Sequence, residues 1–163
     1  MDRDHPPGAA LVIEAFSAAT VTAFEELCRT PVTPGAPAVG RSRPLPNVVT
    51  AEIDLRRAAP GRLVVAFPRP VLHALAARFL PDDVSVTPDI ADDAAGEFAN
   101  VIAGQAKTML KGTVYHFNLS TPQPASAAPA DGPDFLTLPF DCDAGAFSVC
   151  VHLPPCEESG TAA

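Results

Sequence analysis

The chain has 163 residues, of which 47% are hydrophobic and 18% charged, a composition that suits one globular domain with a buried core. Its formal net charge of −8 argues against nucleic acids and anionic membranes as partners. The first residues are not the basic start of a signal peptide, and no apolar run approaches the length of a membrane span. We therefore expect a cytoplasmic protein.

The cysteines and histidines do not indicate a metal site. Cys28, Cys142, Cys150 and Cys156 form no Cys-x-x-Cys pair, and the four histidines show no ligand spacing around them. We expect buried thiols in a reducing compartment, with Cys156 near the tail as the candidate for an exposed and oxidisable one. Glycine-rich phosphate loops, nucleophile elbows and His-Glu-x-x-His motifs are absent from the sequence. The prediction is that this chain holds no metal and no cofactor.

The first part of the chain predicts one helix followed by a proline-rich edge. Residues 1–8 are polar, and we expect them to be disordered. Residues 9–29 repeat apolar side chains at helical spacing. The predicted core positions of this helix are Leu11, Val12, Phe16, Ala19, Ala23, Phe24 and Leu27. Residues 30–46 hold five prolines, which restricts them to a loop or an edge strand.

The next part predicts a β-hairpin and a short helix. Apolar and polar residues alternate over residues 47–57, and a turn leads into a second strand over residues 62–67. The second strand is apolar on both faces, so we expect it to be central in its sheet. Residues 68–80 predict a short helix with two solvated arginines, Arg69 and Arg78.

The longest predicted helix runs from Pro88 to Lys111. Thr87 can cap its N-terminus, Pro88 suits the first helical position, and Gly112 suits the residue just past the end. On a helical wheel of roughly 100° per residue, one side is the face that a core would take. That predicted core face consists of Ala94, Phe98, Val101, Ile102, Gln105 and Met109.

The opposite face of this helix is polar. It carries Asp93, Glu97, Asn100, Gly104, Lys107, Thr108 and Lys111. Glu97 and Asn100 lie side by side, roughly 60° apart, because they are three residues apart. Gly104 follows one turn beyond Asn100, and glycine inside a helix costs about 1 kcal/mol relative to alanine. It either leaves room for another protein to approach this pair or allows close packing within the same chain.

The final part predicts three strands. Residues 113–121 form the first, with Val114, Tyr115, Phe117 and Leu119 as its apolar positions. Residues 122–133 are rich in Pro, Ala and Ser and predict a flexible loop. Residues 135–142 and 147–153 alternate as the strands of a last hairpin. Since helices and strands do not alternate as βαβα, we predict an α+β fold with a mostly antiparallel sheet and helices packed on one side.

The long helix also resembles a known signature. Its run Gly-Glu-Phe-Ala-Asn-Val-Ile-Ala-Gly-Gln-Ala-Lys, residues 96–107, is similar to the signature helix of the CheC/CheX/FliY phosphatases, which remove the phosphate from the phosphorylated chemotaxis response regulator. The family pattern is Asp or Ser, three residues, Glu, two residues, Asn and later a Pro. These positions correspond to Asp93, Glu97, Asn100 and Pro122, with Pro122 one residue nearer than the pattern expects.

The first helix separates two branches of this family. Some members carry a second Glu-x-x-Asn site there, but this chain has Glu14 followed by Ser17 in place of Asn. The resemblance therefore favours the one-site CheX type over the two-site CheC type. It implies a single CheX-like domain over residues 9–153, a disordered tail at residues 154–163, and a homodimer.

The resemblance implies an aspartyl-phosphate phosphatase, a hydrolase that acts on a CheY-type receiver. Asn100 would orient the attacking water, and Glu97 would pair with the lysine that receivers keep beside the phosphate. Asp93, Gly104, Lys107 and Lys111 would contact the partner, which would bring its own Mg²⁺. Two alternatives remain: a non-catalytic adaptor that binds a receiver, a flagellar-switch component or a chemoreceptor component, and a purely structural dimerisation domain.

Lys107 and Lys111, the only lysines of the chain, generate a first prediction. They either contact the acidic phosphorylation site of the receiver or only complement the helix dipole, which is worth a few tenths of a kcal/mol. If they contact the receiver, replacing both with alanine weakens receiver binding in a salt-dependent way, as titration calorimetry at low and high salt can measure. Unchanged affinity at low salt would leave only the dipole role.

Overall fold

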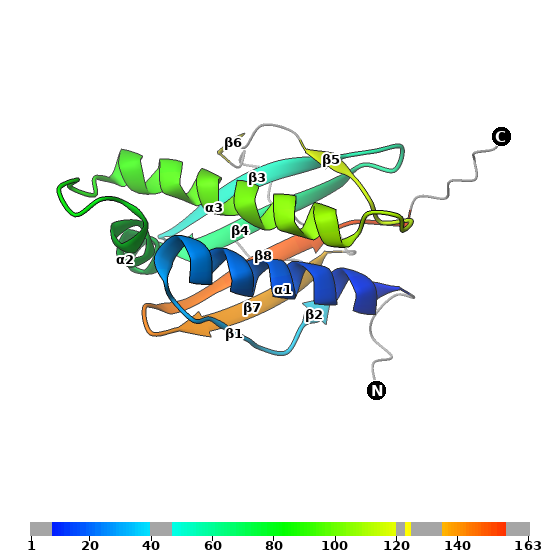
Figure 1. Cartoon of the computed structure of the whole chain (residues 1–163), viewed down its shortest axis with the longest axis horizontal. Helices are drawn as coiled ribbons and strands as arrows, with labels where there is room; N and C mark the ends of the chain where they lie inside the picture. Colours follow the sequence, from blue (N-terminus) through cyan, green and yellow to red (C-terminus); the bar gives the residue numbers. More distant parts are fainter. Residues whose placement is uncertain (1–7, 40–46, 120–122, 125–134, 156–163) are drawn as a thin grey trace.

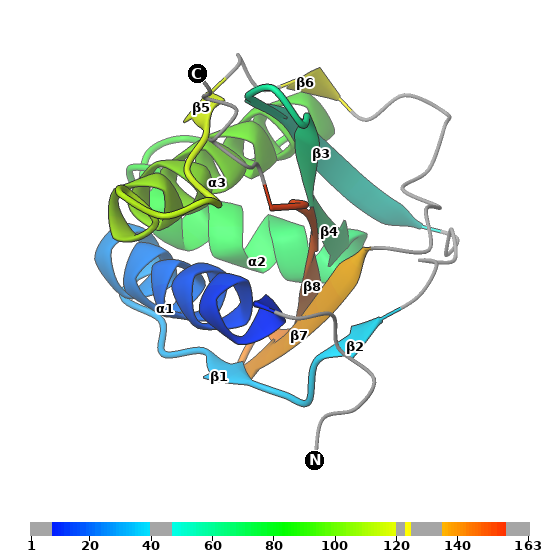
Figure 2. The same cartoon turned by 90° about the vertical axis from the view of Figure 1, so that its right-hand side faces the viewer.

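The fold has two layers, a sheet and a set of helices. The computed structural model describes residues 8–39, 47–119, 123–124 and 135–155. Helices α1 (Ala9–Cys28), α2 (Arg69–Phe79) and α3 (Pro88–Met109) cover one face of the sheet (Figure 1), and the layering is seen edge-on in Figure 2. This is the α+β arrangement with helices on one side that the sequence predicts. In the described part of the chain, no helix is long and apolar enough to cross a membrane.

Within the described residues the sheet has eight strands, and all of their pairings are antiparallel. Its strands are β1 (Thr33–Pro34), β2 (Ala38–Val39), β3 (Val48–Arg56), β4 (Gly61–Pro68), β5 (Asn118–Leu119), β6 (Gln123–Pro124), β7 (Leu136–Cys142) and β8 (Gly145–His152). The order is β1-β7-β8-β4-β3-β5, with β2 also on β7 and β6 also on β3. The described part of the proline-rich segment, residues 30–39, therefore lies at an edge of the sheet, where a missing N–H is tolerated.

The central position of β4 follows from its composition. Leu63, Val65 and Phe67 are fully buried on the helix side, and Val64 is buried on the opposite face with Phe135 and Cys150. Apolar side chains on both faces are typical of a strand in the middle of a sheet. In this sheet β4 lies between β3 and β8. The predicted hairpin of β3 and β4 and the predicted central strand are both confirmed.

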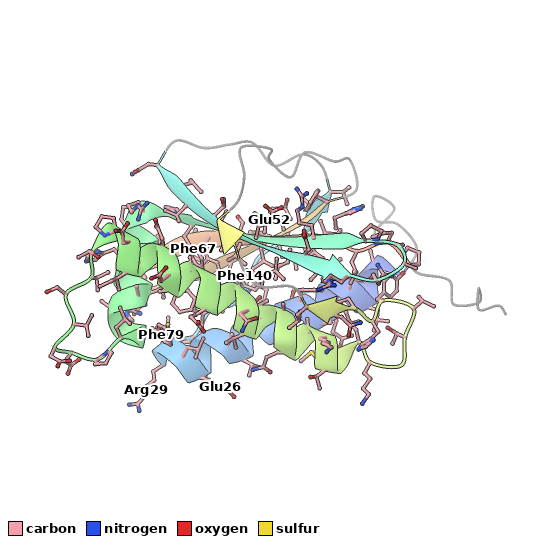
Figure 3. All side chains as sticks on the ribbon, turned by 90° about the horizontal axis from the view of Figure 1, so that it is seen from above. Glu26, Arg29, Glu52, Phe67, Phe79 and Phe140 are labelled. Carbon is pink, nitrogen blue, oxygen red and sulfur yellow. The ribbon has the colours of Figure 1, made fainter. Side chains whose placement is uncertain are left out.

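A cluster of phenylalanine rings joins the helices to the sheet. The Phe98 ring of α3 lies with its centroid 5.0 Å from that of Phe24, 5.9 Å from Phe67 and 5.4 Å from Phe79. Phe98 is fully buried, so all three elements that carry its neighbours pack around one side chain of α3. In contrast, Glu26 and Arg29 at the end of α1 point away from the core (Figure 3).

The predicted core faces of α1 and α3 need correction. Leu11, Gln105 and Met109 were expected inside, but Leu11 is 39% exposed and Met109 is 44% exposed. The half-buried Gln105 donates a hydrogen bond from Nε2 to Glu26 Oε1, at 3.4 Å. The buried side chains of α3 are Ala91, Ala94, Ala95, Phe98, Ala99, Ile102, Ala103 and Ala106. The true core face is therefore turned by about 60° from the predicted one, toward a stripe of alanines.

The strand predicted over residues 113–121 is mostly a turn. The Thr113 hydroxyl donates to the Leu110 carbonyl at 2.7 Å and accepts from the Tyr115 N–H at 3.1 Å, which closes the backbone locally. Val114 is 44% exposed, and among the described residues of this segment, 113–119, only Asn118–Leu119 pairs with β3. The predicted loop over residues 122–133 contains a second short pairing, β6, and its other residues lie outside the described residues. Of the end segments predicted to be disordered, 1–8 and 154–163, the structure describes only Gly8, Pro154 and Pro155.

Removal of the Phe98 ring generates a stability prediction. We expect Phe98→Ala to lower the free energy of unfolding by about 3–5 kcal/mol, because the surrounding rings cannot collapse fully into the space left behind. Urea denaturation followed by circular dichroism measures the change. Leu11→Ala is the control, since its side chain is 39% exposed, and a similar loss in both variants would contradict this description of the core.

Candidate functional site

The ends of α3 are fixed by local chemistry. The Thr87 hydroxyl oxygen accepts a hydrogen bond from the Ile90 N–H at 3.2 Å, which caps the N-terminus as predicted. Gly112 has a φ of 84°, the left-handed conformation that favours glycine where the chain leaves a helix. The 22 residues Pro88–Met109 form one continuous helix, which sets the spacing of every side chain on its outer face.

Glu97 and Asn100 lie together on that outer face. Three helical residues separate them by about 4.5 Å along the axis and about 60° around it. Glu97 and Asp93 are exposed, and Asn100 is half-buried. No described residue forms a hydrogen bond or ion pair with any of these three side chains. A carboxylate and an amide are therefore presented without a partner from the described part of their own chain.

Gly104 is open to solvent on the same face. A Cβ atom added there would meet no described atom within 4 Å, apart from the backbone of the helix itself. Close packing within the chain, one of the two explanations offered by the sequence, is therefore wrong for the described residues. Because Gly104 has no side chain, nothing projects from the helix surface about one turn beyond Asn100.

The polar face of α3 changes sign along its length. Asp93 and Glu97 occupy its first half and Lys107 its last turn, and Lys111 follows in the turn just after the helix. Lys107 lies seven residues beyond Asn100, about 10 Å along the axis and at nearly the same angle around it. Neither lysine forms an ion pair with a described residue.

An open groove of about 850 Å³ adjoins the acidic half of α3. Its walls come from the start of β3 (residues 48–51), from Arg69 and Phe79 of α2, and from the first part of α3 as far as Glu97. Glu97 thus belongs both to the groove and to the outer face that carries Asn100. The sequence alone gave no signal for this groove, because its walls are brought together only by the fold.

Both arginines of α2 are exposed to solvent, as predicted, and each also forms an ion pair. Arg69 Nη1 lies 2.9 Å from Asp92 Oδ1, and Arg78 Nη1 lies 2.7 Å from Asp143 Oδ1. Arg78 also donates to the Thr30 hydroxyl at 2.9 Å. The partners lie 23 and 65 residues away in the sequence, so local patterns could not identify them.

The three described thiols are free: Cys28 and Cys150 are buried, as expected, and Cys142 is half-buried. Burial raises the pKa of Cys28 to about 12, against the opposing effect of the nearby Arg78 charge, and burial also raises the pKa of Cys150. These two cysteines are therefore protonated at neutral pH and are not nucleophiles. Cys156 and Pro122 lie outside the described residues. Within the described ranges, no three or more His, Cys, Asp or Glu residues gather as they would around a metal ion.

The fold and the outer face of α3 define an α+β protein with an antiparallel sheet and a Glu-x-x-Asn helix. A family model described as chemotaxis phosphatase CheX matches residues 49–134, which is more than half of the chain and includes all of α3. The chain belongs to the CheX family of chemotaxis phosphatases. No curated protein sequence matches it.

Solved structures share the fold over most of the chain. A chemotaxis protein of Desulfovibrio vulgaris Hildenborough is 27% identical with a TM-score of 0.73, over 88% of this chain and 96% of that one. CheX of Desulfovibrio desulfuricans is 24% identical with a TM-score of 0.71, over 88% and 99%. CheX of Borrelia burgdorferi, in a complex with CheY, BeF₃ and Mg²⁺, is 16% identical with a TM-score of 0.70, over 86% and 96%.

The open surroundings of Gly104 generate a prediction about stability and binding. Gly104→Ala should raise the free energy of unfolding by up to about 1 kcal/mol, because alanine is the better helix former and its methyl group meets no described atom. Urea denaturation measures this gain. If this face binds the receiver that the resemblance implies, a larger side chain, as in Gly104→Leu, should weaken that binding without unfolding the protein. A destabilising Gly104→Ala would show that the glycine serves the fold instead.

Proposed function

We propose that this chain is an aspartyl-phosphate phosphatase that acts on a phosphorylated CheY-type receiver. The observation that carries the proposal is the placement of Glu97 and Asn100, side by side and unpaired among the described residues, on the outer face of the helix that resembles the family signature. Membership of the CheX family supports the reaction class. The complex of the Borrelia protein with CheY supports the choice of partner.

The reaction asks for positioning more than for new covalent chemistry. Water attacks phosphorus as the bond from phosphorus to the aspartyl oxygen breaks, which yields inorganic phosphate and the free receiver carboxylate. In the proposal, the Asn100 amide oxygen accepts a hydrogen bond from the attacking water, and its NH₂ group donates to an acceptor in the receiver site. An oriented water removes much of the entropic barrier of the step.

Glu97 acts in binding. Its carboxylate would pair with the lysine that receivers keep beside the phosphate, which fixes the receiver so that Asn100 enters the site in register. A charge-assisted hydrogen bond of this kind is stronger than a neutral one. Mg²⁺, carried by the receiver, would neutralise the phosphoryl oxygens. Because the pair stands on a rigid helix, the two roles are held at a fixed separation.

A non-catalytic adaptor would bind its partner through the same Glu97–Asn100 surface and would differ from the phosphatase only in its effect on the phosphoryl group. It would bind the receiver or a flagellar-switch component without shortening the lifetime of the phosphoryl group. The presence of Asn100 favours the enzyme, since a lysine-binding carboxylate alone would suffice for an adaptor. The homodimer that the resemblance implies remains a prediction, as does the cytoplasmic location.

Two substitutions separate catalysis from binding. Asn100→Ala should lower kcat for dephosphorylation of a receiver from the same organism by about 100-fold, with receiver binding retained, because the water loses its orientation. Glu97→Ala should mainly raise KM, because the anchoring pair is lost. Decay of the ³²P-labelled receiver measures both effects.

The matched controls are Asn118→Ala and Glu14→Ala, which remove an exposed amide of β5 and an exposed carboxylate of α1. With either control variant, the phosphorylated receiver should lose its phosphate at the rate seen with the wild-type protein. If the wild-type protein binds the phosphorylated receiver and leaves its lifetime unchanged, the adaptor function replaces the phosphatase.

A further inference from the structure

The groove beside Glu97 has an apolar floor that is only partly covered. Val48, Val49, Phe79, Leu80 and Ile90 line it, and all five side chains are half-buried. They come from β3, from the end of α2 and from the first turn of α3. Half-buried apolar side chains gathered in one open groove are typical of a surface that gains free energy when a partner covers it.

The rim of the groove is charged and predominantly negative. Asp92, Asp93 and Glu97 contribute three carboxylates, and Arg69 contributes one guanidinium, which leaves two net negative charges. Arg69 is already paired with Asp92 at 2.9 Å, so the unpaired charge of the rim is that of Asp93 and Glu97. Such a rim attracts a cationic segment and repels an acidic one.

The Arg69–Asp92 pair contributes little to the fold itself. The Arg69 side chain is 37% exposed and the Asp92 side chain is 47% exposed, and exposed ion pairs are weak because water screens them. Its position on the rim gives it a second effect, since each partner masks the charge of the other. The pair therefore sets how negative the groove is to a molecule that approaches it.

We infer that this groove is a docking site for a receiver segment that carries apolar side chains and positive charge, continuous with the Glu97–Asn100 face. The inference rests on the proposed function, because Glu97 belongs to both surfaces and a receiver lysine paired with Glu97 places the neighbouring receiver surface over the groove. In this arrangement Asp92 and Arg69 determine which receivers bind, and Asn100 determines how fast they are dephosphorylated.

Neutralising each partner of the ion pair in turn tests the inference. Both Asp92→Asn and Arg69→Gln break the same pair, so a purely structural role predicts effects of the same sign. The docking role predicts opposite signs: Asp92→Asn raises the Kd for a beryllofluoride-loaded receiver about two- to fivefold at low salt, and Arg69→Gln lowers it by a similar factor. Both effects should shrink at about 0.5 M salt. The kcat at saturating receiver should stay unchanged in both variants.

An apolar substitution with a matched control tests the floor of the groove. Ile90→Ala should raise the Kd for the loaded receiver, whereas Ile13→Ala, which truncates a half-buried isoleucine of α1 outside the groove, should not. Unfolding by urea shows whether the two truncations cost similar stability. Equal Kd values in the two variants would contradict the docking site, as would changes of the same sign in the Asp92 and Arg69 variants.

The outcomes distinguish this inference from the proposed function. If the chain speeds dephosphorylation of the receiver and this effect needs Asn100, but the Asp92 and Arg69 variants do not change Kd in opposite directions, the docking site is wrong and the phosphatase stands. If the receiver binds with opposite shifts in the two variants and its lifetime does not change, the phosphatase is wrong and the docking site stands. If the two variants shift self-association in sedimentation experiments instead, the groove binds a second copy of the chain and the inference is overturned.

Discussion

The close packing of α3 on α1, α2 and β3 is the constraint on which the candidate site depends. Ala95, Ala99 and Ala103 are fully buried, and side chains this small let the helix approach its neighbours closely. Phe98 and Ile102 extend from the same side into the core and prevent the helix from turning about its axis. Successive residues of a helix are about 100° apart around its axis, so the orientation of the buried face also fixes that of the outer face. This packing therefore keeps the Glu97 and Asn100 side chains on the outer surface of the domain.

Much of this arrangement follows from sequence patterns. Alternation of apolar and polar residues places β3 and β4 in their hairpin, and the prolines of residues 30–46 keep the described part of that segment at an edge. The polar face of α3 was predicted correctly, because charged residues mark it clearly. Its buried face was misplaced by about 60°, because large apolar residues such as Met109 were weighted above alanines. In helix packing a small side chain can matter more than a hydrophobic one.

Features made by contacts between distant segments could not be predicted. The groove joins residues of β3, α2 and α3, and the Arg69–Asp92 pair spans 23 residues. The turn after α3 combines backbone hydrogen bonds with two made by the Thr113 hydroxyl, and these local contacts override the β-propensity of Val114 and its neighbours. The Glu97–Asn100 pair was found only through its resemblance to a family signature, since Glu-x-x-Asn on a polar helix face is common and carries little information.

Helix α3 combines a closely packed inner face with an outer face whose chemistry changes along its length. The first half is acidic and adjoins the groove, the Asn100 amide lies at the middle, and the end is basic. The most direct test is a crystal structure of this chain with a beryllofluoride-loaded receiver. The account predicts that the Asn100 amide lies in the receiver site, within hydrogen-bonding distance of a water in line with the bond to the aspartyl oxygen, and that Glu97 pairs with the receiver lysine. A receiver bound elsewhere, with Asn100 facing solvent, would contradict it.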